Sequence, residues 1–137
     1  MRIYLAHPIT DYGTARQSQA IAALKSHFAD LGRPLEIENP DQPHHQSGYA
    51  SGGMDYFRGV VESCHGVAFM RFPDGSIGAG VGKEIRWGYL NSSRMYEVFG
   101  GKVYPLTGDM PTPILSVEDT RATLRQLRES HLESAHV

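Results

Sequence analysis

The segment GSIGAGVGKE, residues 75–84, has the residue types and spacing that most suggest chemistry. Its glycines precede Lys83 and Glu84, which invites comparison with a phosphate-binding loop. A P-loop needs glycine where Ile77 stands and serine or threonine where Glu84 stands, and the dinucleotide fingerprint G-x-G-x-x-G also fails here. Both familiar phosphate motifs are therefore excluded. Closely approaching backbone beside a carboxylate instead suits a nucleophile or a group that stabilises a cation.

Glu84 is predicted in the first turn or so of a helix, where the helix dipole favours negative charge. We therefore expect its carboxylate to be ionised. The same position also fits a solvent-exposed acid placed only for the dipole, and the local sequence leaves both interpretations open.

Two further side chains could act with Glu84. Tyr4 lies near the end of an apolar strand, so its hydroxyl could orient the Glu84 carboxylate, or its ring could simply fill the core. Asp55 opens a helix and could serve as a general acid, or only as a first-turn acid. Two carboxylates at one site can divide acid and base roles when their environments differ.

The histidines suggest no metal site, and the function that we expect for the chain requires no cofactor. His44 and His45 are adjacent, so they would point to opposite sides of a strand, and neither an H-x-x-x-H pattern nor a cysteine pair accompanies them. His7 follows the first apolar strand and could contact a ligand, or have no role. Cys64 falls on the apolar face of a helix and is expected to pack there.

Composition limits the classes of protein to which the chain could belong. Its 137 residues and net charge of −2 fit one domain, residues 1–137, of an ordinary globular protein. No basic run supports duplex nucleic-acid binding, and no apolar stretch is long enough for a membrane helix. The single cysteine excludes an intrachain disulfide, and the short apolar start does not resemble a signal peptide. We therefore expect a cytoplasmic protein.

Strand and helix patterns alternate along the chain. Strands are predicted over 2–6, 34–39, 66–71 and 102–106, and helices over 14–31, from Met54, over 80–96 and from Ser116. This alternation predicts an α/β fold with a mostly parallel sheet of four to five strands and helices on both faces. Ligands of such sheets bind at the carboxyl ends of the strands. The loops 7–13, 39–53 and 72–80 should therefore meet at one site.

Four segments together resemble the nucleoside 2-deoxyribosyltransferase-like superfamily. RIYLAHPIT is similar to its opening strand and loop, and MDYFRGVVESCHGVAFM to its second helix and third strand. GAGVGKEIRWGYL resembles its S-x-G-V-G-x-E loop and helix, and GGKVYPL its following strand. The resemblance spans roughly residues 2–106.

The resemblance implies a flavodoxin-like or Rossmann-like three-layer sandwich that cleaves the N-glycosidic bond of a nucleoside or nucleoside 5′-monophosphate. By position, Glu84 matches the nucleophile, Tyr4 the residue that orients it, and Asp55 the acid near the base. The implied mechanism is that of a retaining glycosidase, in which the carboxylate traps C1′ as a glycosyl ester. The expected substrate contacts are His7, Pro8, Ile9, Thr10, Ser76, Gly78, Gly80 and Gly82. The resemblance also implies a homo-oligomer.

The chain departs from the family pattern at several positions. Gly78 stands where an Asp or Ser is usual, and no asparagine follows Asn91, although transferases of the family use one near the C-terminus. Hydrolysis is therefore favoured over sugar transfer. Ser76, Thr10 and Arg16 are candidate phosphate contacts. Two alternatives stay open: a phosphoribohydrolase of the cytokinin-activating type, and a nucleotide-sensing module that binds without cleaving.

Overall fold

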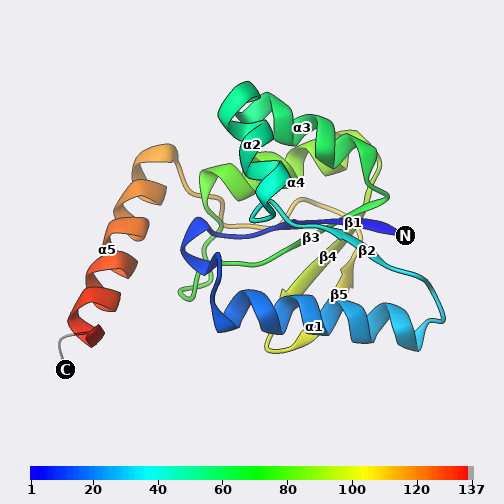
Figure 1. Ribbon diagram of the computed structural model, residues 1–137, viewed down its shortest axis with the longest axis horizontal. Helices are drawn as coiled ribbons and strands as arrows, with labels where there is room; N and C mark the ends of the chain where they lie inside the picture. Colours follow the sequence, from blue (N-terminus) through cyan, green and yellow to red (C-terminus); the bar gives the residue numbers. More distant parts are fainter. Residues whose placement is uncertain (136–137) are drawn as a thin grey trace.

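The computed structural model describes residues 1–135, so the last two residues of the predicted domain lie outside it (Figure 1). Strands and helices alternate along most of the chain. The elements are β1 (Arg2–Ala6), the 3-10 helix η1 (Ile9–Asp11), α1 (Ala15–Asp30), β2 (Glu36–Glu38), α2 (Pro43–Gly52), α3 (Met54–Ser63), β3 (Gly66–Phe69), α4 (Ala79–Leu90), β4 (Arg94–Phe99), β5 (Lys102–Leu106) and α5 (Val117–Ala135).

The strands form one five-stranded sheet in the order β2-β1-β3-β4-β5. The first three pairings are parallel, and only β4 with β5 is antiparallel. The predicted α/β fold with a mostly parallel sheet is therefore confirmed. In the central pairing Tyr4 lies opposite Val67, so β1 and β3 end at the same edge of the sheet.

The two faces of the sheet bury different helices. Because strand side chains alternate, Tyr4 and Phe69 pack with residues of α3 and α4, whereas Ile3 and Leu5 pack with α1. Figure 1 shows α1 on one side of the strands and α2, α3 and α4 on the other. Glu84, on α4, is thereby placed above the face of β1 that carries Tyr4.

α1 begins and ends within one residue of the helix predicted over 14–31. Thr14 is its N-cap, and its side chain accepts a hydrogen bond from the backbone N–H of Gln17. At the start of α5, the Ser116 hydroxyl oxygen accepts a 3.1 Å hydrogen bond from the backbone N–H of Asp119. Within residues 1–135, no helix combines the length and apolar character that a membrane span requires.

The prediction of a long loop over residues 39–53 is wrong, because most of it forms α2. Pro43 occupies the first turn of this helix, where its missing N–H costs nothing. The polar, glycine-containing sequence lacks an apolar periodicity, which is why the pattern indicates a loop. Gly48 explains how the helix packs: a Cβ there would lie 2.2 Å from the Tyr56 ring of α3.

The predicted helix over 80–96 is too long, and one strand is missed. α4 ends at Leu90, and a turn containing Ser92 at φ 55° leads into β4. The predicted strand 102–106 is therefore β5, the fifth strand rather than the fourth. Gly100 and Gly101, at φ 57° and 77°, make the tight turn between β4 and β5. This Gly-Gly hairpin explains why the last pairing is antiparallel.

Candidate active site

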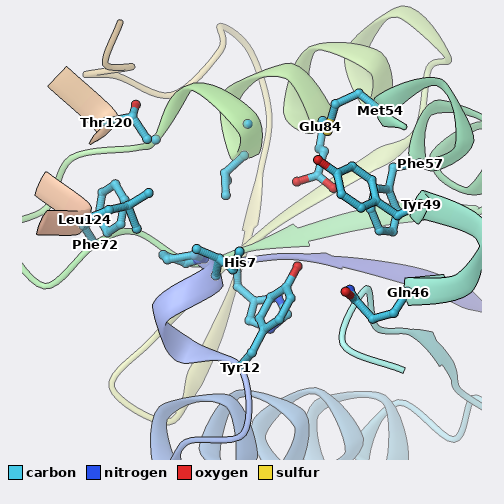
Figure 2. Close-up of a pocket in the computed structure, with 15 residues that line it drawn as sticks. His7, Tyr12, Gln46, Tyr49, Met54, Phe57, Phe72, Glu84, Thr120 and Leu124 are labelled. Carbon is cyan, nitrogen blue, oxygen red and sulfur yellow. The ribbon is translucent and has the colours of Figure 1, made fainter. Parts of the chain in front are cut away.

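A pocket of about 230 Å³ opens at the edge of the sheet where β1 and β3 end (Figure 2). The loops after these strands meet there with α2, α3, α4 and α5, so the predicted convergence of three segments is confirmed. The lining residues are His7, Pro8, Ile9, Tyr12, Gln46, Tyr49, Met54, Phe57, Phe72, Gly78, Gly80, Val81, Glu84, Thr120 and Leu124.

Glu84 and Tyr4 form a buried hydrogen-bonded pair at the wall of this pocket. The Tyr4 hydroxyl donates to Oε2 of Glu84. Tyr4 is fully buried on β1, whereas Glu84 is 7% exposed and lines the pocket. The phenol therefore fixes the carboxyl group from below and leaves its other oxygen, Oε1, for a ligand.

Burial changes the charge state expected for Glu84. Desolvation raises the pKa of Glu84 to about 8, and the Tyr4 hydrogen bond opposes this rise only in part. Desolvation, with the nearby Glu84 carboxyl group, also raises the pKa of Tyr4 well above its ordinary value. The expectation of an ionised Glu84 near neutral pH is therefore wrong for the free protein. The residue is the sixth of α4, beyond the first turn where the helix dipole acts.

One wall of the pocket is apolar and aromatic. Tyr49 stacks on Phe57, with ring centroids 5.5 Å apart and an interplanar angle of 27°, and Met54 lies on the same wall. Phe72 and Leu124 line the pocket from the β3 loop and α5. Flat aromatic surfaces with a few polar groups among them suit a planar heteroaromatic ring.

His7 is held rigidly at the floor of the pocket. Its Nδ1 lies 3.0 Å from the carbonyl oxygen of Leu5, and its Nε2 lies 2.7 Å from Oε1 of Gln17. The Gln17 amide in turn donates to Asp41 at 3.0 Å. The ring of Tyr12 packs 4.8 Å from the His7 ring. Because both ring nitrogens have protein partners, His7 offers a ligand its ring surface rather than a free N–H.

Five of the predicted substrate contacts line the pocket and three do not. His7, Pro8, Ile9, Gly78 and Gly80 are in the lining, together with Glu84. Thr10 is half-buried in η1 and is not in the lining.

The other two predicted contacts serve packing and turn formation. Ser76 is buried and donates through its hydroxyl and its backbone N–H to the Asp74 carboxylate, at 2.6 and 2.9 Å. A Cβ on Gly82 would lie 2.6 Å from Ile114, so this glycine allows a close approach of protein rather than of ligand.

Asp55 does not join Glu84 in the described chain. It lies in the first turn of α3, is exposed, and is absent from the pocket lining. The helix carries its apolar side, Phe57 and Val61, toward the core, which turns Asp55 outward. Arg16, a candidate phosphate contact, binds the Asp11 carboxylate and the Arg71 carbonyl outside this pocket.

Sequence reasoning missed much of the pocket wall. Met54 and Phe57 have the spacing of a helical core face, so their pattern gives no sign of a ligand. Tyr49 falls in a segment whose sequence is typical of a loop. Thr120 comes from α5. Its hydroxyl oxygen accepts a 2.8 Å hydrogen bond from the backbone N–H of Ala79, at the start of α4. No local signal could have linked α5 to residues so distant in sequence.

Among the described residues that line the pocket, no group of metal ligands has its ligand atoms close together. Among the residues that the structure describes, one group of three such side chains has its ligand atoms close together, and it lies elsewhere, at Glu38, His44 and His45.

A scan against protein-family models, a search of curated proteins and a search of solved structures each found no match for the chain. The geometry of the site is therefore the main basis for assigning a function.

Proposed function

We propose that the protein is an N-glycosidase that cleaves the bond between base and sugar in a nucleoside or nucleoside 5′-monophosphate. The observation that supports this most strongly is the hydrogen-bonded pair of Tyr4 and Glu84 at the wall of a largely apolar pocket. A buried carboxyl group, oriented by one donor and facing an aromatic cavity, is suited to meet a developing carbocation.

In the proposed reaction the glycosidic bond breaks as C1′ becomes positively charged. The base leaves as an anion with the bonding electron pair and takes up a proton from water. The ionised Glu84 carboxylate attacks C1′ through Oε1, while Oε2 keeps the hydrogen bond from Tyr4. Water then hydrolyses the glycosyl ester, which releases the sugar and restores the carboxylate. Asp55 has no part in this scheme because it is exposed outside the pocket.

The pocket has walls that fit the two ends of such a substrate. Tyr49 and Phe57 offer stacked ring surfaces to a base. Gly78 and Gly80 bring the start of α4 to the opposite part of the lining, and a Cβ on Gly80 would meet no atom within 4 Å. A helix start with this open backbone is suited to the hydroxyls or phosphate of a sugar.

The fold supports the same proposal at a coarser level. The strand order 2-1-3-4-5 is that of flavodoxin-like sheets, with β5 reversed. This order supports a flavodoxin-like three-layer sandwich as part of the proposal, in line with the four segments that resemble the nucleoside 2-deoxyribosyltransferase-like superfamily. Whether water or a second base accepts the sugar is decided by the experiment below.

The test is release of free base, followed by chromatography. Purified protein would be incubated with deoxyribo- and ribonucleosides and their 5′-monophosphates, with and without an acceptor base. We expect release from at least one member of the panel and its loss in Glu84→Gln, which preserves size. Glu62→Gln is the matched control, because Glu62 is exposed on α3 and lies outside the lining.

The results that can follow separate the rival functions. Exchange of one base for another would show transfer in place of hydrolysis. Binding of a nucleotide with an intact glycosidic bond across the whole panel would contradict the proposal and favour a sensing module. Release that is unchanged in Glu84→Gln would contradict the assigned nucleophile.

A further inference from the structure

A second cluster of reactive side chains lies outside the pocket, where β2 leads into α2. It consists of Glu38, His44 and His45, whose ligand atoms all lie within 4.8 Å of one another. We propose that these three residues bind a divalent transition metal ion of the Zn²⁺ class. This site is independent of the role proposed for Glu84.

The distances require little rearrangement to hold an ion. Oε2 of Glu38 lies 2.6 Å from Nε2 of His45 and 3.9 Å from Nε2 of His44. In a tetrahedral zinc site with bonds of about 2.0 Å, neighbouring ligand atoms lie roughly 3.3 Å apart. The Glu38–His45 distance must therefore lengthen and the Glu38–His44 distance must shorten by a similar amount, and all three ligand atoms already lie within 4.8 Å of one another. Rotation of the two rings, whose centroids are 4.0 Å apart, changes both distances.

Neighbouring groups already hold two of the three ligands in place. Nδ1 of His45 lies 2.6 Å from the Tyr56 hydroxyl, and Oε1 of Glu38 accepts a 2.6 Å hydrogen bond from the Arg2 guanidinium. When Nε2 of His45 binds the ion, its proton moves to Nδ1, which can donate to Tyr56. Ligating histidines commonly have such a partner on the second nitrogen. Arg2 engages only Oε1, so Oε2 is left for the metal.

Charge and exposure also fit a metal site. The Arg2 guanidinium lies 2.6 Å from Oε1 of Glu38, which places a positive charge beside this carboxylate. Glu38 and His45 are buried, whereas the His44 side chain is 64% exposed. The ion can enter from the His44 side, and water can supply a fourth ligand there.

The ligand types indicate the class of metal. Two imidazoles and one carboxylate suit Zn²⁺, Co²⁺, Ni²⁺ or Cu²⁺, whereas Mg²⁺ and Ca²⁺ prefer oxygen ligands throughout. The sequence argument against a metal assumed a strand or loop at His44 and His45. Because the pair lies instead in the first turn of α2, both rings can turn toward Glu38.

An ion at this site would join β2 to α2 directly, and α3 through the contact of His45 with Tyr56. Glu38 is on β2, the histidines are on α2, and Tyr56 is on α3. α2 also supplies Gln46 and Tyr49 to the pocket described above. The metal would therefore fix the α2 wall of that pocket and stabilise the fold.

The test is a titration of chelator-treated protein with Zn²⁺, by calorimetry and by thermal unfolding. We expect one equivalent to bind and to raise Tm, because an ion that binds only the folded state stabilises it. Mg²⁺ should leave Tm unchanged. Co²⁺ should give the visible absorption of a tetrahedral site.

Two variants locate the binding. His44→Gln, at an exposed position, should fold normally and weaken Zn²⁺ binding at least about tenfold. Glu36→Gln should bind like the wild type, because Glu36 lies on the same strand and pairs with Arg2 but is not in the cluster. No binding by the wild type, or equal binding by His44→Gln, would overturn the proposal.

Discussion

At the scale of single residues, the protein keeps a carboxyl group in a place where its charge is costly. Glu84 is buried against a tyrosine, and desolvation raises its pKa to about 8. Polar groups that are perturbed by burial and face a cavity are concentrated at functional sites. Burial of Glu84 therefore both lowers the stability of the folded protein and prepares the carboxyl group for the proposed reaction.

This cost should be visible as a dependence of stability on pH. The unfolded chain releases the Glu84 proton near 4.5, whereas the folded protein keeps it until about 8. Across that window the folded state binds more protons, so Glu84 makes the free energy of unfolding fall as pH rises. Glu84→Gln removes this term and should raise stability by on the order of 3 kcal/mol near neutral pH.

Denaturant unfolding of the wild type and Glu84→Gln at several pH values measures the difference. The gain from the substitution should be small near pH 4.5 and should grow as pH approaches 8. Glu62→Gln, on the exposed side of α3, should show no such trend. A gain that stays constant over this range would contradict a raised pKa for Glu84.

Tyr4→Phe tests whether the phenol positions the carboxyl group. Removing the hydroxyl leaves Oε2 of Glu84 without its donor, and because that hydrogen bond lowers the pKa of Glu84, the pKa should rise further. We expect base release to slow roughly 100-fold through loss of alignment. The pH midpoint of kcat/KM should also move upward. Base release by Tyr4→Phe at the wild-type rate would contradict a positioning role for Tyr4.

At the scale of secondary structure, the sequence predicts elements with clear periodicity and misses those defined by turns or partners. The apolar spacing of α1 and α3 identifies both helices. β4 is missed because its residues continue the apolar pattern of α4, although Gly100 and Gly101 give a hairpin signal that could have separated the strands. α2 has no apolar periodicity, so its contacts with α3 decide its structure.

The sequence likewise predicts some residues of the candidate site and misses others. Motif spacing identifies Glu84 and Tyr4, and strand ends identify the loop with His7. The sequence does not fix the direction in which Asp55 points, because the rotation of α3 about its axis depends on how Phe57 and Val61 pack. The raised pKa of Glu84 also depends on tertiary burial, which the local helix-dipole argument does not include.

The contact between α2 and α3 can be tested at Gly48. A Cβ there would lie 2.2 Å from the Tyr56 ring, so Gly48→Ala should destabilise the protein by about 1–3 kcal/mol. Gly59→Ala is the matched control on α3, since its Cβ would meet no atom within 4 Å. In that open helical position alanine should be neutral or stabilising by up to about 1 kcal/mol. Equal effects of the two substitutions on thermal unfolding would contradict the close packing of α2 on α3.

At the scale of the whole molecule, the parallel order of the sheet brings distant segments to one edge. The residue after β1, the start of α4 and part of α5 meet at the pocket although the chain separates them widely. Figure 1 shows α5 extending away from the sheet and its other helices. Val117 at the start of α5 is 50% exposed, and Ile9 at the pocket is 54% exposed.

The homo-oligomer that the resemblance implies stays a prediction. Light scattering after size-exclusion chromatography should give at least twice the mass of one chain at micromolar concentration. A species with the mass of a single chain would contradict the expectation. In that case the site would have to function with the residues of one chain alone.

The most direct measurement for the central claim is the pH dependence of kcat/KM for base release, from about pH 6 to about pH 10. This ratio reports the ionisation of the free enzyme. A nucleophilic Glu84 must lose its proton, so the account predicts that kcat/KM rises with pH and levels off above a midpoint near 8. A kcat/KM that falls through the same midpoint would show that the protonated carboxyl group is the active form, and would contradict the assignment of Glu84 as the nucleophile.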